Sequence, residues 1–399
     1  MSLAHGRPYL AIPGPSVTPD RVMRAMMRTS PNIYEGELVD MVPGLVRDLA
    51  GVARTQGDAV IYIGNGHAAW EAALVNVVAP GDRVLFLRTG AFTDGWAGQA
   101  RTLGIEAEVM AFDQRRGIDV EALAVRLAEP DAREFRAVCV VHVDTATSLR
   151  CDVAAVRAAM DEAGIEALLM LDCMASLGCD EVAMDDWGVD VLTAGSQKGL
   201  MTPPGLAFLF VSAKARAARV RLARVSQYWD WDPRIAPDAF YRYFCGTAPT
   251  HHLYGLRAAL DMIAEEGLAA VNRRHAVLAG AVRRAVEHWG QGGPLELTVT
   301  DPARRSNAVT GVRAGSAKAT DLRRWCEDRA GLTLGIGLGM APPDAPEWHH
   351  FFRIGHMGHM NAHMVLGALA TIEAGLTAVG IEHRPGGVVA AAEVVAEGA

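Results

Sequence analysis

The chain has 399 residues, of which half are hydrophobic and 21% are charged. This length and composition exclude a disulfide-stapled miniprotein and a disordered chain, and they allow two domains with sizeable cores. Acidic residues outnumber basic ones by 46 to 38, which gives a net charge of −8. Because such a chain has no overall attraction for phosphate backbones or anionic lipid, we expect neither nucleic acid nor a membrane as a partner.

The six cysteines are spread along the chain, at positions 139, 151, 173, 179, 245 and 326. They form no C-x-x-C pair and none of the cysteine and histidine spacings of a zinc site, so we predict no metal centre. The N-terminus has no basic segment followed by an apolar stretch, and no run of 18 apolar residues occurs. These features predict free thiols in a cytoplasmic protein without a signal peptide or membrane span.

Between residues 58 and 212, short β-branched segments alternate with helical patterns, as in βαβ units. Most of the expected strands are apolar almost throughout, which is typical of strands covered by helices on both faces. The seven strands are 59–64, 83–88, 106–112, 137–143, 167–172, 189–195 and 206–212. The sequence therefore predicts an α/β domain with a mainly parallel seven-stranded sheet. One of its helices should begin after Asp152 and stop at Gly164.

An aromatic, irregular stretch follows the last strand, and then comes a helix with an apolar stripe, formed by Leu253, Leu256, Leu260 and Ile263. From about residue 267 the pattern indicates a smaller α+β domain. Its expected elements are a long basic-faced helix, strand-like stretches at 295–300 and 306–313, a helix over 321–330, the Gly-rich LGIGLGM, FFRIGHMGHMN and a further helix. The tail after 385 shows only low complexity.

We therefore expect three units in the chain. They are an N-terminal segment over 1–20, a large domain over 21–266 and a small C-terminal domain over 267–399.

An acid and a lysine each lie at the end of a predicted strand: Asp172 ends ALLMLD, and Lys198 follows VLTAGSQ. Because parallel strands end at one edge of a sheet, both side chains can face the same crevice. A lysine there can form a Schiff base with an aldehyde cofactor, and a carboxylate can keep a pyridinium nitrogen protonated. Taken singly, the acid reads as a turn former and the lysine as a solvated side chain. Together they indicate a site for pyridoxal 5'-phosphate.

A third part fits this site. In AVIYIGNGHAAWEA a strand is followed by a turn with Gly64 and Gly66 and by a helix that begins near His67. Backbone N–H groups at such a helix start can hold a phosphate. A Gly-x-Gly turn is more often plain turn geometry, so it supports the site only beside the acid and the lysine. The G-x-G-x-x-G fingerprint of a dinucleotide-binding protein is absent, although a doubly wound binding protein stays an alternative.

Four segments carry a resemblance to a known family: VDVLTAGSQKGLMTPPG, LMLDCMASLG, GNGHAAWEA and FFRIGHMG. In their order and spacing they resemble the class V, fold-type I pyridoxal-phosphate aminotransferases, most of all the serine-glyoxylate and alanine-glyoxylate aminotransferases. The similarity begins at PGPSVTPDRVMRAM and covers nearly the whole chain. It implies the fold of a fold-type I transferase, the cofactor pyridoxal 5'-phosphate, and a homodimer with its site at the subunit interface.

The resemblance also implies roles for matching positions. Lys198 would be the Schiff-base lysine that moves a proton, Asp172 the partner of the pyridine nitrogen, and Arg353 the group that binds the substrate carboxylate. Further residues would hold the cofactor: Gly66, His67 and Gln197 at the phosphate, Thr145 by a hydrogen bond, Phe92 by stacking, Tyr243 at the phosphate and Thr247 across the dimer interface.

Some of these positions have plainer alternatives. Phe92 fits a core position equally well, and Arg353 could form a structural ion pair. His142 would be a hydrogen-bonded core histidine or a catalytic one. The tyrosine of the family matches Tyr243, although Phe244, Cys245 and Gly246 lie nearer the threonine.

The family's acidic-Thr-Ser-Thr-Gly run appears here as DTATS over 144–148, which keeps the hydroxyl of Thr145. A second departure, SPNIYEGEL over 30–38, replaces the His-Arg-Gly run of serine-glyoxylate relatives and leaves the amino donor open. We expect transfer of an amino group from serine or alanine to glyoxylate. The alternatives are a ureidoglycine-glyoxylate or pyridoxamine-pyruvate aminotransferase and a cysteine desulfurase-like lyase, which needs an accessible nucleophilic cysteine.

Overall fold

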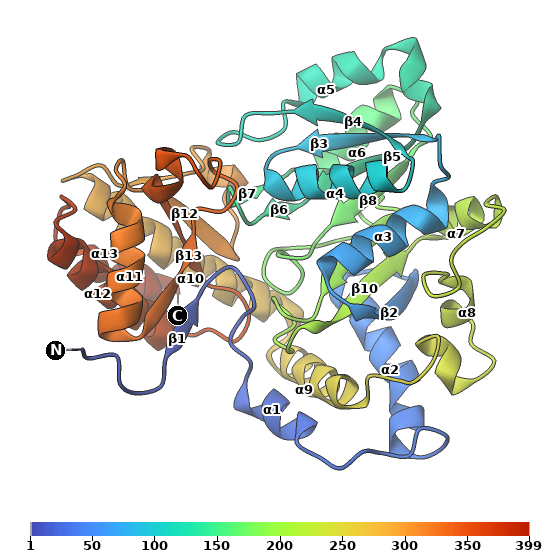
Figure 1. Ribbon diagram of the computed structural model, residues 1–399, viewed down its shortest axis with the longest axis horizontal. Helices are drawn as coiled ribbons and strands as arrows, with labels where there is room; N and C mark the ends of the chain where they lie inside the picture. Colours follow the sequence, from blue (N-terminus) through green and yellow to red (C-terminus); the bar gives the residue numbers. More distant parts are fainter. Residues whose placement is uncertain (1, 399) are drawn as a thin grey trace.

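The computed structural model describes residues 2–398. Its central sheet has the strand order β2-β10-β9-β8-β5-β3-β4 (Figure 1). The strands are β2 (Asp58–Gly64), β3 (Arg83–Arg88), β4 (Glu106–Ala111), β5 (Phe135–Val141), β8 (Leu168–Asp172), β9 (Val191–Gly195) and β10 (Gly205–Val211). All neighbours run parallel except β10, which is antiparallel to both β2 and β9. The predicted α/β sheet is thus confirmed, with strand ends shifted by at most two residues.

One shift has a local cause. The strand predicted over 137–143 ends at Val141, and the chain turns at His142, whose N–H donates to the carbonyl of Asp172. The next residues form β6 (Val143–Asp144), which pairs with β7 (Leu149–Arg150) in a separate two-stranded ribbon. The ribbon carries the chain away from the central sheet at the edge where the strands end.

Helices cover both faces of the sheet, which explains why its strands are apolar throughout. In β3, Leu85 and Leu87 pack in the core beneath α2, α5, α6 and α9, whereas Val84 and Phe86 pack beneath α3 and α4 (Figure 1). The helices and turns of this domain are α1 (Asp20–Met26), α2 (Glu37–Val52), α3 (Gly66–Val77), α4 (Ala91–Thr102), α5 (Val120–Leu127), η1 (Pro130–Glu134), α6 (Val153–Glu162), α7 (Ala213–Val220), α8 (Asp232–Ile235), η2 (Phe240–Tyr243) and α9 (Thr250–Glu266).

Two helices follow the sequence signals closely. The side chain of Asp152 caps α6 by accepting the N–H of Ala155 at 3.0 Å, and Gly164 just beyond the helix has a φ of +65°. The predicted apolar stripe of α9 is buried along its whole length. The irregular stretch before α9 contains α8 and η2 rather than one continuous element.

The second sheet has the order β1-β13-β14-β12-β11. Its strands are β1 (Tyr9–Ala11), β11 (Glu296–Leu297), β12 (Val309–Arg313), β13 (Leu332–Ile336) and β14 (Phe351–Gly355). The helices and turns of this part of the chain are α10 (Leu268–Gly290), η3 (Pro302–Arg304), α11 (Lys318–Ala330), η4 (Pro346–His350), α12 (Ala362–Val379) and α13 (Gly387–Gly398). The predicted unit boundaries stay predictions. The structure adds that β1 pairs with β13, so part of the N-terminal segment lies in the small domain's sheet (Figure 1).

The tail after 385, which the sequence shows only as low complexity, forms α13 and packs along α10. Gly387 permits this contact, because a Cβ there would lie 2.2 Å from the indole nitrogen of Trp289. One helix, α12, is long and apolar enough to cross a membrane by length and composition alone. Its buried side chains, among them Leu369, Ile372 and Leu376, pack in the core of the small domain.

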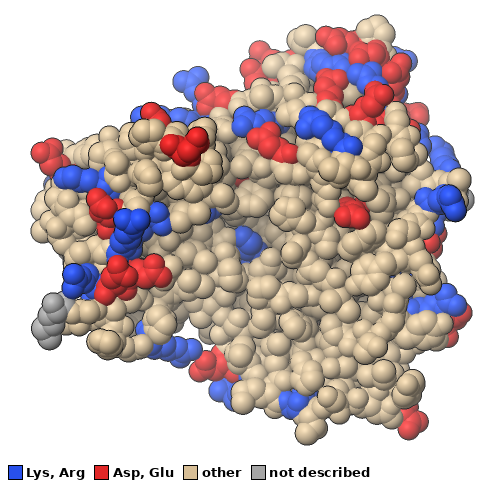
Figure 2. Space-filling view, in the orientation of Figure 1, with Lys and Arg blue, Asp and Glu red and all other residues tan. Residues whose placement is uncertain are grey.

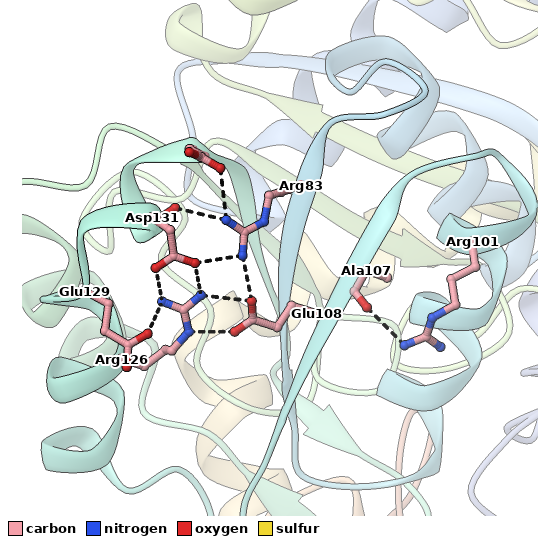
Figure 3. A network of polar contacts seen from close by, with 8 residues as sticks. Arg83, Arg101, Ala107, Glu108, Arg126, Glu129 and Asp131 are labelled. Atoms are coloured by element: carbon pink, nitrogen blue, oxygen red, sulfur yellow. Dashed lines mark hydrogen bonds and ion pairs between the residues drawn. The ribbon is translucent and has the colours of Figure 1, made fainter.

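A network of charged side chains protects β4, the edge strand of the central sheet (Figure 3). Arg126 Nε lies 2.6 Å from Glu108 Oε1 and its Nη2 lies 3.1 Å from Asp131, while Arg83 also pairs with both carboxylates. Hydrogen bonds from the guanidinium groups lower the pKa of Glu108 and of Asp131. The network thus holds β3, β4, α5 and η1 together through charge.

We predict that Arg126→Ala lowers the free energy of unfolding near neutral pH by about 1 kcal/mol, because its partners are partly exposed and screened by solvent. Carboxyl groups whose pKa is lowered in the fold stabilise it above their unfolded pKa, and this stabilisation disappears as pH falls through the folded value. The difference between wild type and variant should therefore shrink in acid and in high salt. Chemical denaturation over a pH series measures it, with Arg133→Ala, an exposed neighbour outside the network, as the control. A difference that stays constant with pH would mean that only packing was lost.

Candidate active site

A cavity of about 330 Å³ lies where several strands of the central sheet end. Its walls come from the turn after β2, the starts of α3 and α4, the ends of β5 and β8, the loop after β9, and the N-terminal segment. Seven of the predicted site residues line it: Gly66, His67, Phe92, Thr145, Asp172, Gln197 and Lys198. The sheet therefore gathers at one edge residues that lie far apart in sequence.

Asp172, the last residue of β8, is 2% exposed. Its Oδ1 accepts the N–H of Met174 at 2.6 Å, and its Oδ2 accepts the indole N–H of Trp70 at 2.9 Å. Burial raises the pKa of Asp172 to about 6, and the two hydrogen bonds act in the opposite direction. A buried acid of this kind favours a cationic partner, such as a protonated ring nitrogen.

Lys198 lies in the loop after β9, with its ammonium group donating to the carbonyl of Pro13. Burial, aided by the positive charge of Arg353, lowers the pKa of Lys198 to about 8. A much larger fraction of this amine is therefore neutral near pH 7 than of a solvated lysine, and the neutral amine is the nucleophilic form. The loop packs tightly, because a Cβ at Gly199 would lie 2.2 Å from the carbonyl oxygen of Leu177.

The N-terminal segment forms one wall of the cavity directly over the lysine. Ser16 donates from its hydroxyl to the carbonyl of Lys198 at 2.7 Å, and its N–H donates to the carbonyl of Gln197 at 2.8 Å. Gly14 has a φ of +93°, and a Cβ there would lie 2.5 Å from Cδ and Cε of Lys198. The positive φ favours glycine at this position, and a larger residue would also have to push the lysine side chain aside.

The turn before α3 differs in one respect from the sequence expectation. Asn65 caps the helix, and its Oδ1 accepts the N–H groups of His67 at 3.1 Å and of Ala68 at 3.4 Å. Two of the N–H groups expected to hold a phosphate are thus already paired within the chain. Nearby, the buried Oε1 of Gln197 has no hydrogen-bond partner among the described residues. This oxygen only accepts hydrogen bonds, so the amide N–H groups are the part of Gln197 that can donate to a phosphate.

Asp144 organises the opposite wall. Its carboxylate is fully buried, and it accepts the N–H of Phe92 at 3.0 Å and the N–H of Ala146 at 2.9 Å. Gly90 makes room for it, because a Cβ there would lie 2.3 Å from the carboxyl carbon. Asp144 thereby fixes the start of α4, which carries Phe92, beside the segment that carries Thr145.

Arg353, on β14 of the small domain, packs behind this wall against Thr145 and is not among the residues that line the cavity; it is 6% exposed. Its Nε donates to the carbonyl of Ile336 at 2.6 Å and its Nη1 to the carbonyl of Thr145 at 2.7 Å. Burial lowers its pKa to about 10, an effect that the charge of Asp144 opposes. Within residues 2–398 no carboxylate lies close enough to form an ion pair with it, so the alternative of a structural ion pair is wrong. The charge of Asp144 compensates the guanidinium only from a distance, and a buried guanidinium without a direct ion pair favours an anionic guest.

Two predicted cofactor-binding residues, Tyr243 and Thr247, and the histidine with two alternative roles, His142, do not line the cavity. Tyr243 packs between Phe240 and Phe244 and lines a separate hollow beside α2, and Thr247 is exposed in the loop before α9. Their roles at the phosphate stay predictions. His142 is buried, with its Nδ1 2.9 Å from the hydroxyl of Ser176, and burial lowers its pKa to about 3. It is the hydrogen-bonded core histidine of the two alternatives.

Sequence reasoning missed Trp70, Asp144, Gly14 and Asn65. Trp70 follows Gly66 by four residues on α3, so helical spacing alone places it on the side of the helix that faces the turn. Asparagine is a common N-cap residue, so the sequence also allows Asn65 to be predicted as the cap of α3. No local signal identified the other two, because their contacts join segments distant in sequence.

Comparisons with known proteins agree with this geometry. Residues 9–362 match the family described as aminotransferase class-V. A serine–glyoxylate aminotransferase from Methylorubrum extorquens is 38% identical over 97% of this chain and 95% of that protein. An L-aspartate–glyoxylate aminotransferase from Paracoccus denitrificans is 32% identical over 96% of this chain and 94% of that protein.

Solved structures show the same fold over almost the full length. A pyridoxamine-pyruvate aminotransferase from Mesorhizobium loti superimposes with a TM-score of 0.87 and 26% identity, covering 99% of both chains. A ureidoglycine-glyoxylate aminotransferase from Bacillus subtilis gives a TM-score of 0.87 at 24% identity, covering 99% of this chain and 100% of that one.

We predict that Gly14→Ala displaces the side chain of Lys198, because the added methyl group would overlap it. Borohydride trapping of pyridoxal 5'-phosphate on Lys198, followed by peptide mapping, should show labelling slowed by about tenfold or more, which corresponds to about 1.4 kcal/mol. Gly36→Ala is the matched control, since Gly36 has a φ of +92° but open space around its Cβ position. Both variants should lose similar stability from backbone strain. Equal labelling in the two variants would show that the contact with Lys198 is unimportant.

Proposed function

We propose that this chain, which belongs to the class V aminotransferase family, transfers an amino group from serine or alanine to glyoxylate and so forms glycine and a 2-oxo acid. It is a pyridoxal-phosphate-dependent transaminase. The observation that carries the proposal is the combination of three buried ionisable groups. The amine of Lys198 and the carboxylate of Asp172 line the cavity, and the guanidinium of Arg353, which forms no direct ion pair within residues 2–398, packs behind the wall at Thr145.

Pyridoxal 5'-phosphate supplies an aldehyde that condenses with amines and a ring that accepts the electron pair of a broken bond. The residues of the cavity fit it. Lys198 holds the aldehyde carbon and, once released, takes the proton from the substrate Cα on its Nζ. Asp172 keeps the ring nitrogen protonated. The N–H of Gly66, the side chain of His67 and the amide N–H groups of Gln197 serve the phosphate, because the main-chain N–H of His67 is already paired with Asn65.

Phe92 and Thr145 complete the cofactor site. Phe92 presents an aromatic ring for offset stacking on an electron-poor ring, and Thr145 supplies a buried hydroxyl. Both residues are positioned by Asp144 through backbone hydrogen bonds, to Phe92 itself and to Ala146 beside Thr145. The cofactor therefore meets a wall that is already fixed before it binds.

Arg353 serves both half-reactions. An amino acid and a 2-oxo acid each carry a carboxylate next to the reacting carbon, so one guanidinium can orient both. Two of its nitrogens are committed to carbonyl groups, which fixes the plane of the guanidinium. Its remaining Nη2 enters no hydrogen bond within residues 2–398, and this nitrogen is the one we assign to the carboxylate.

The choice of substrates rests on two observations. The two curated relatives described above share glyoxylate and differ in the donor, which is serine in one and aspartate in the other. Among the residues that line the cavity, Lys198 and His67 are the only basic ones. Arg353, behind the wall, takes the first carboxylate, and the lining offers a second carboxylate only Lys198 and His67, both of which the proposal assigns to the cofactor. A small neutral donor fits better.

The lyase alternative lacks a suitable nucleophile. Five of the six cysteines are buried, and burial raises the pKa of Cys139, Cys151, Cys173, Cys179 and Cys326. Thiols of this kind stay protonated and inert. The half-buried Cys245 does not line the cavity. No observation favours cysteine desulfuration.

The proposal includes a homodimer in the cytoplasm. The face over α3, α9 and β10 carries few charged side chains, whereas charges gather around α5 and β4 (Figure 2). Ile63, the residue before the end of β2, is 41% exposed although the four residues before it on the strand are buried. Exposed apolar surface beside the open phosphate end of the cavity supports coverage by a second subunit. The cytoplasmic location is supported by six cysteines without a disulfide among the described residues.

The substrate assignment is tested with the purified protein and its cofactor. Serine, alanine, aspartate, ureidoglycine, 2-aminoethylphosphonate and pyridoxamine are each assayed against glyoxylate and pyruvate. We expect the highest kcat/KM for serine or alanine with glyoxylate. Lys198→Ala should lower kcat by about a thousandfold or more, because it removes both the attachment point and the proton carrier. Lys318→Ala, on the surface of the small domain, is the control. Pyridoxamine or ureidoglycine exceeding both amino acids would replace the proposed donor.

The dimer is tested by sedimentation together with cofactor binding. We predict a dimer, and Thr247→Ala should raise the Kd for pyridoxal 5'-phosphate by about tenfold through the loss of one hydrogen bond to a charged phosphate. Thr377→Ala, an exposed threonine on α12, should leave the Kd unchanged. A monomer that binds the cofactor as tightly as the dimer would contradict the role of Thr247.

A further inference from the structure

We propose that Trp70 is the positioning residue for Asp172: its indole N–H orients the carboxylate toward the ring nitrogen of the cofactor and keeps it ionised. The inference rests on the proposed function, in which Asp172 pairs with that nitrogen. It adds a residue that no motif of the sequence assigned.

Trp70 is held rigidly in the wall of the cavity. It is 2% exposed and lies on α3 one turn after Gly66. Its ring stacks on Trp96, with centroids 5.9 Å apart and an interplanar angle of 13°. It also meets the edge of Phe92 at 6.4 Å and the ring of His67 at 4.7 Å. The indole therefore has one orientation, and in that orientation its N–H points at Asp172.

The contacts of Trp70 join three parts of the cofactor site. His67 belongs to the turn assigned to the phosphate, Phe92 supplies the stacking ring, and Asp172 serves the ring nitrogen. A shift of the indole would thus misplace all three parts relative to one another. Few residues in the cavity wall make such a connection.

The hydrogen bond also bears on the charge of Asp172. The carboxylate has two donors: the N–H of Met174 on Oδ1 and the indole of Trp70 on Oδ2. Burial favours the protonated, neutral acid, and so does the negative charge of Asp144, while Lys198 acts in the opposite direction. Trp70 is the only side-chain donor to this carboxylate among the described residues. A protonated Asp172 could not stabilise a positive ring nitrogen, so the indole helps to keep the acid in its useful form.

The neighbouring Trp96 supplies a matched control. It is buried and stacked on Trp70, yet its own Nε1 has no hydrogen-bond partner in the part of the chain that the structure describes. Trp96→Phe therefore removes indole packing from the same pair of rings without removing a hydrogen bond. Trp70→Phe removes similar packing together with the donor to Asp172. The difference in cofactor affinity between the two variants therefore measures the effect of the hydrogen bond alone.

The experiment measures the Kd for pyridoxal 5'-phosphate over a pH series in wild type, Trp70→Phe, Trp96→Phe, Asp172→Asn and the double variant Trp70→Phe/Asp172→Asn. We expect Trp70→Phe to raise the Kd by about tenfold, as for the loss of a hydrogen bond to a charged group. The Kd of Trp96→Phe should stay within about twofold of the wild-type Kd, which is well below the change expected for the loss of one such hydrogen bond. The affinity for the cofactor should fall as the pH is lowered and Asp172 becomes protonated. The pH midpoint of this loss should be higher in Trp70→Phe, because without the indole N–H the effect of burial on the pKa of Asp172 is less opposed. In the Asp172→Asn background, Trp70→Phe should add little.

Each alternative result has a defined meaning. If Trp70→Phe matches Trp96→Phe in Kd and in pH midpoint, Trp70 only packs, and the inference is overturned while the proposed function stands. Equal effects of Trp70→Phe in the wild-type and Asp172→Asn backgrounds would also overturn it. If Asp172→Asn binds the cofactor as wild type does, the proposed role of Asp172 itself fails.

A second variant guards against misfolding of Trp70→Phe. Trp70 is replaced by β-(3-benzothienyl)alanine, which keeps the shape of the indole and carries sulfur in place of the N–H. This protein should show the same higher pH midpoint, with a cooperative thermal unfolding transition lowered by no more than the loss of one hydrogen bond. A wild-type midpoint in this variant would refute the inference, because only the donor has been removed.

Discussion

The site depends on ionisable groups held out of water without a full set of partners. Asp172 is buried with two neutral hydrogen-bond donors, and Arg353 is buried with two carbonyl groups and no carboxylate. Burial shifts the pKa of each toward its neutral form, as it does for Lys198. Such an arrangement destabilises the empty protein and is offset by ligands of opposite charge, a cationic ring nitrogen at the acid and a carboxylate at the guanidinium.

The fold brings these groups together from both sheets. The central sheet places Asp172 and the lysine loop at the same edge, and β14 of the small domain extends Arg353 to the carbonyl of Thr145. The N-terminal segment connects the two parts, because β1 pairs with β13 and the following residues, up to Ser16, hydrogen-bond to the lysine loop. The lysine and the arginine are therefore tied to the same short stretch of chain, which gives the cavity a wall common to both domains.

The parts of this arrangement that the sequence predicts are those with a local signal. The strands are apolar runs because helices cover both faces, and Asp172 and Lys198 are recognisable because each follows such a run. The contact of Trp70 with Asp172 joins residues 102 positions apart, and that of Asp144 with Phe92 joins residues 52 apart. The periodic pattern of apolar residues cannot reveal contacts between residues so far apart in sequence. Gly14 has a φ of +93°, which itself favours glycine, but its contact with the side chain of Lys198 joins residues distant in sequence and has no local signal.

The two buried acids of the site, Asp144 and Asp172, have different roles because they accept hydrogen bonds from different donors. Asp144 accepts two backbone N–H groups and fixes a helix start, so its position is set by the main chain. Asp172 has one backbone donor and one side-chain donor, and it alone of the two lines the cavity. With Lys198 and Arg353, these acids form a set of two negative and two positive groups. A phosphate and a substrate carboxylate add more negative charge than the cationic ring nitrogen offsets, so further hydrogen-bond donors must come from the open end of the cavity, where the side chains of Asn65 and His67 are exposed.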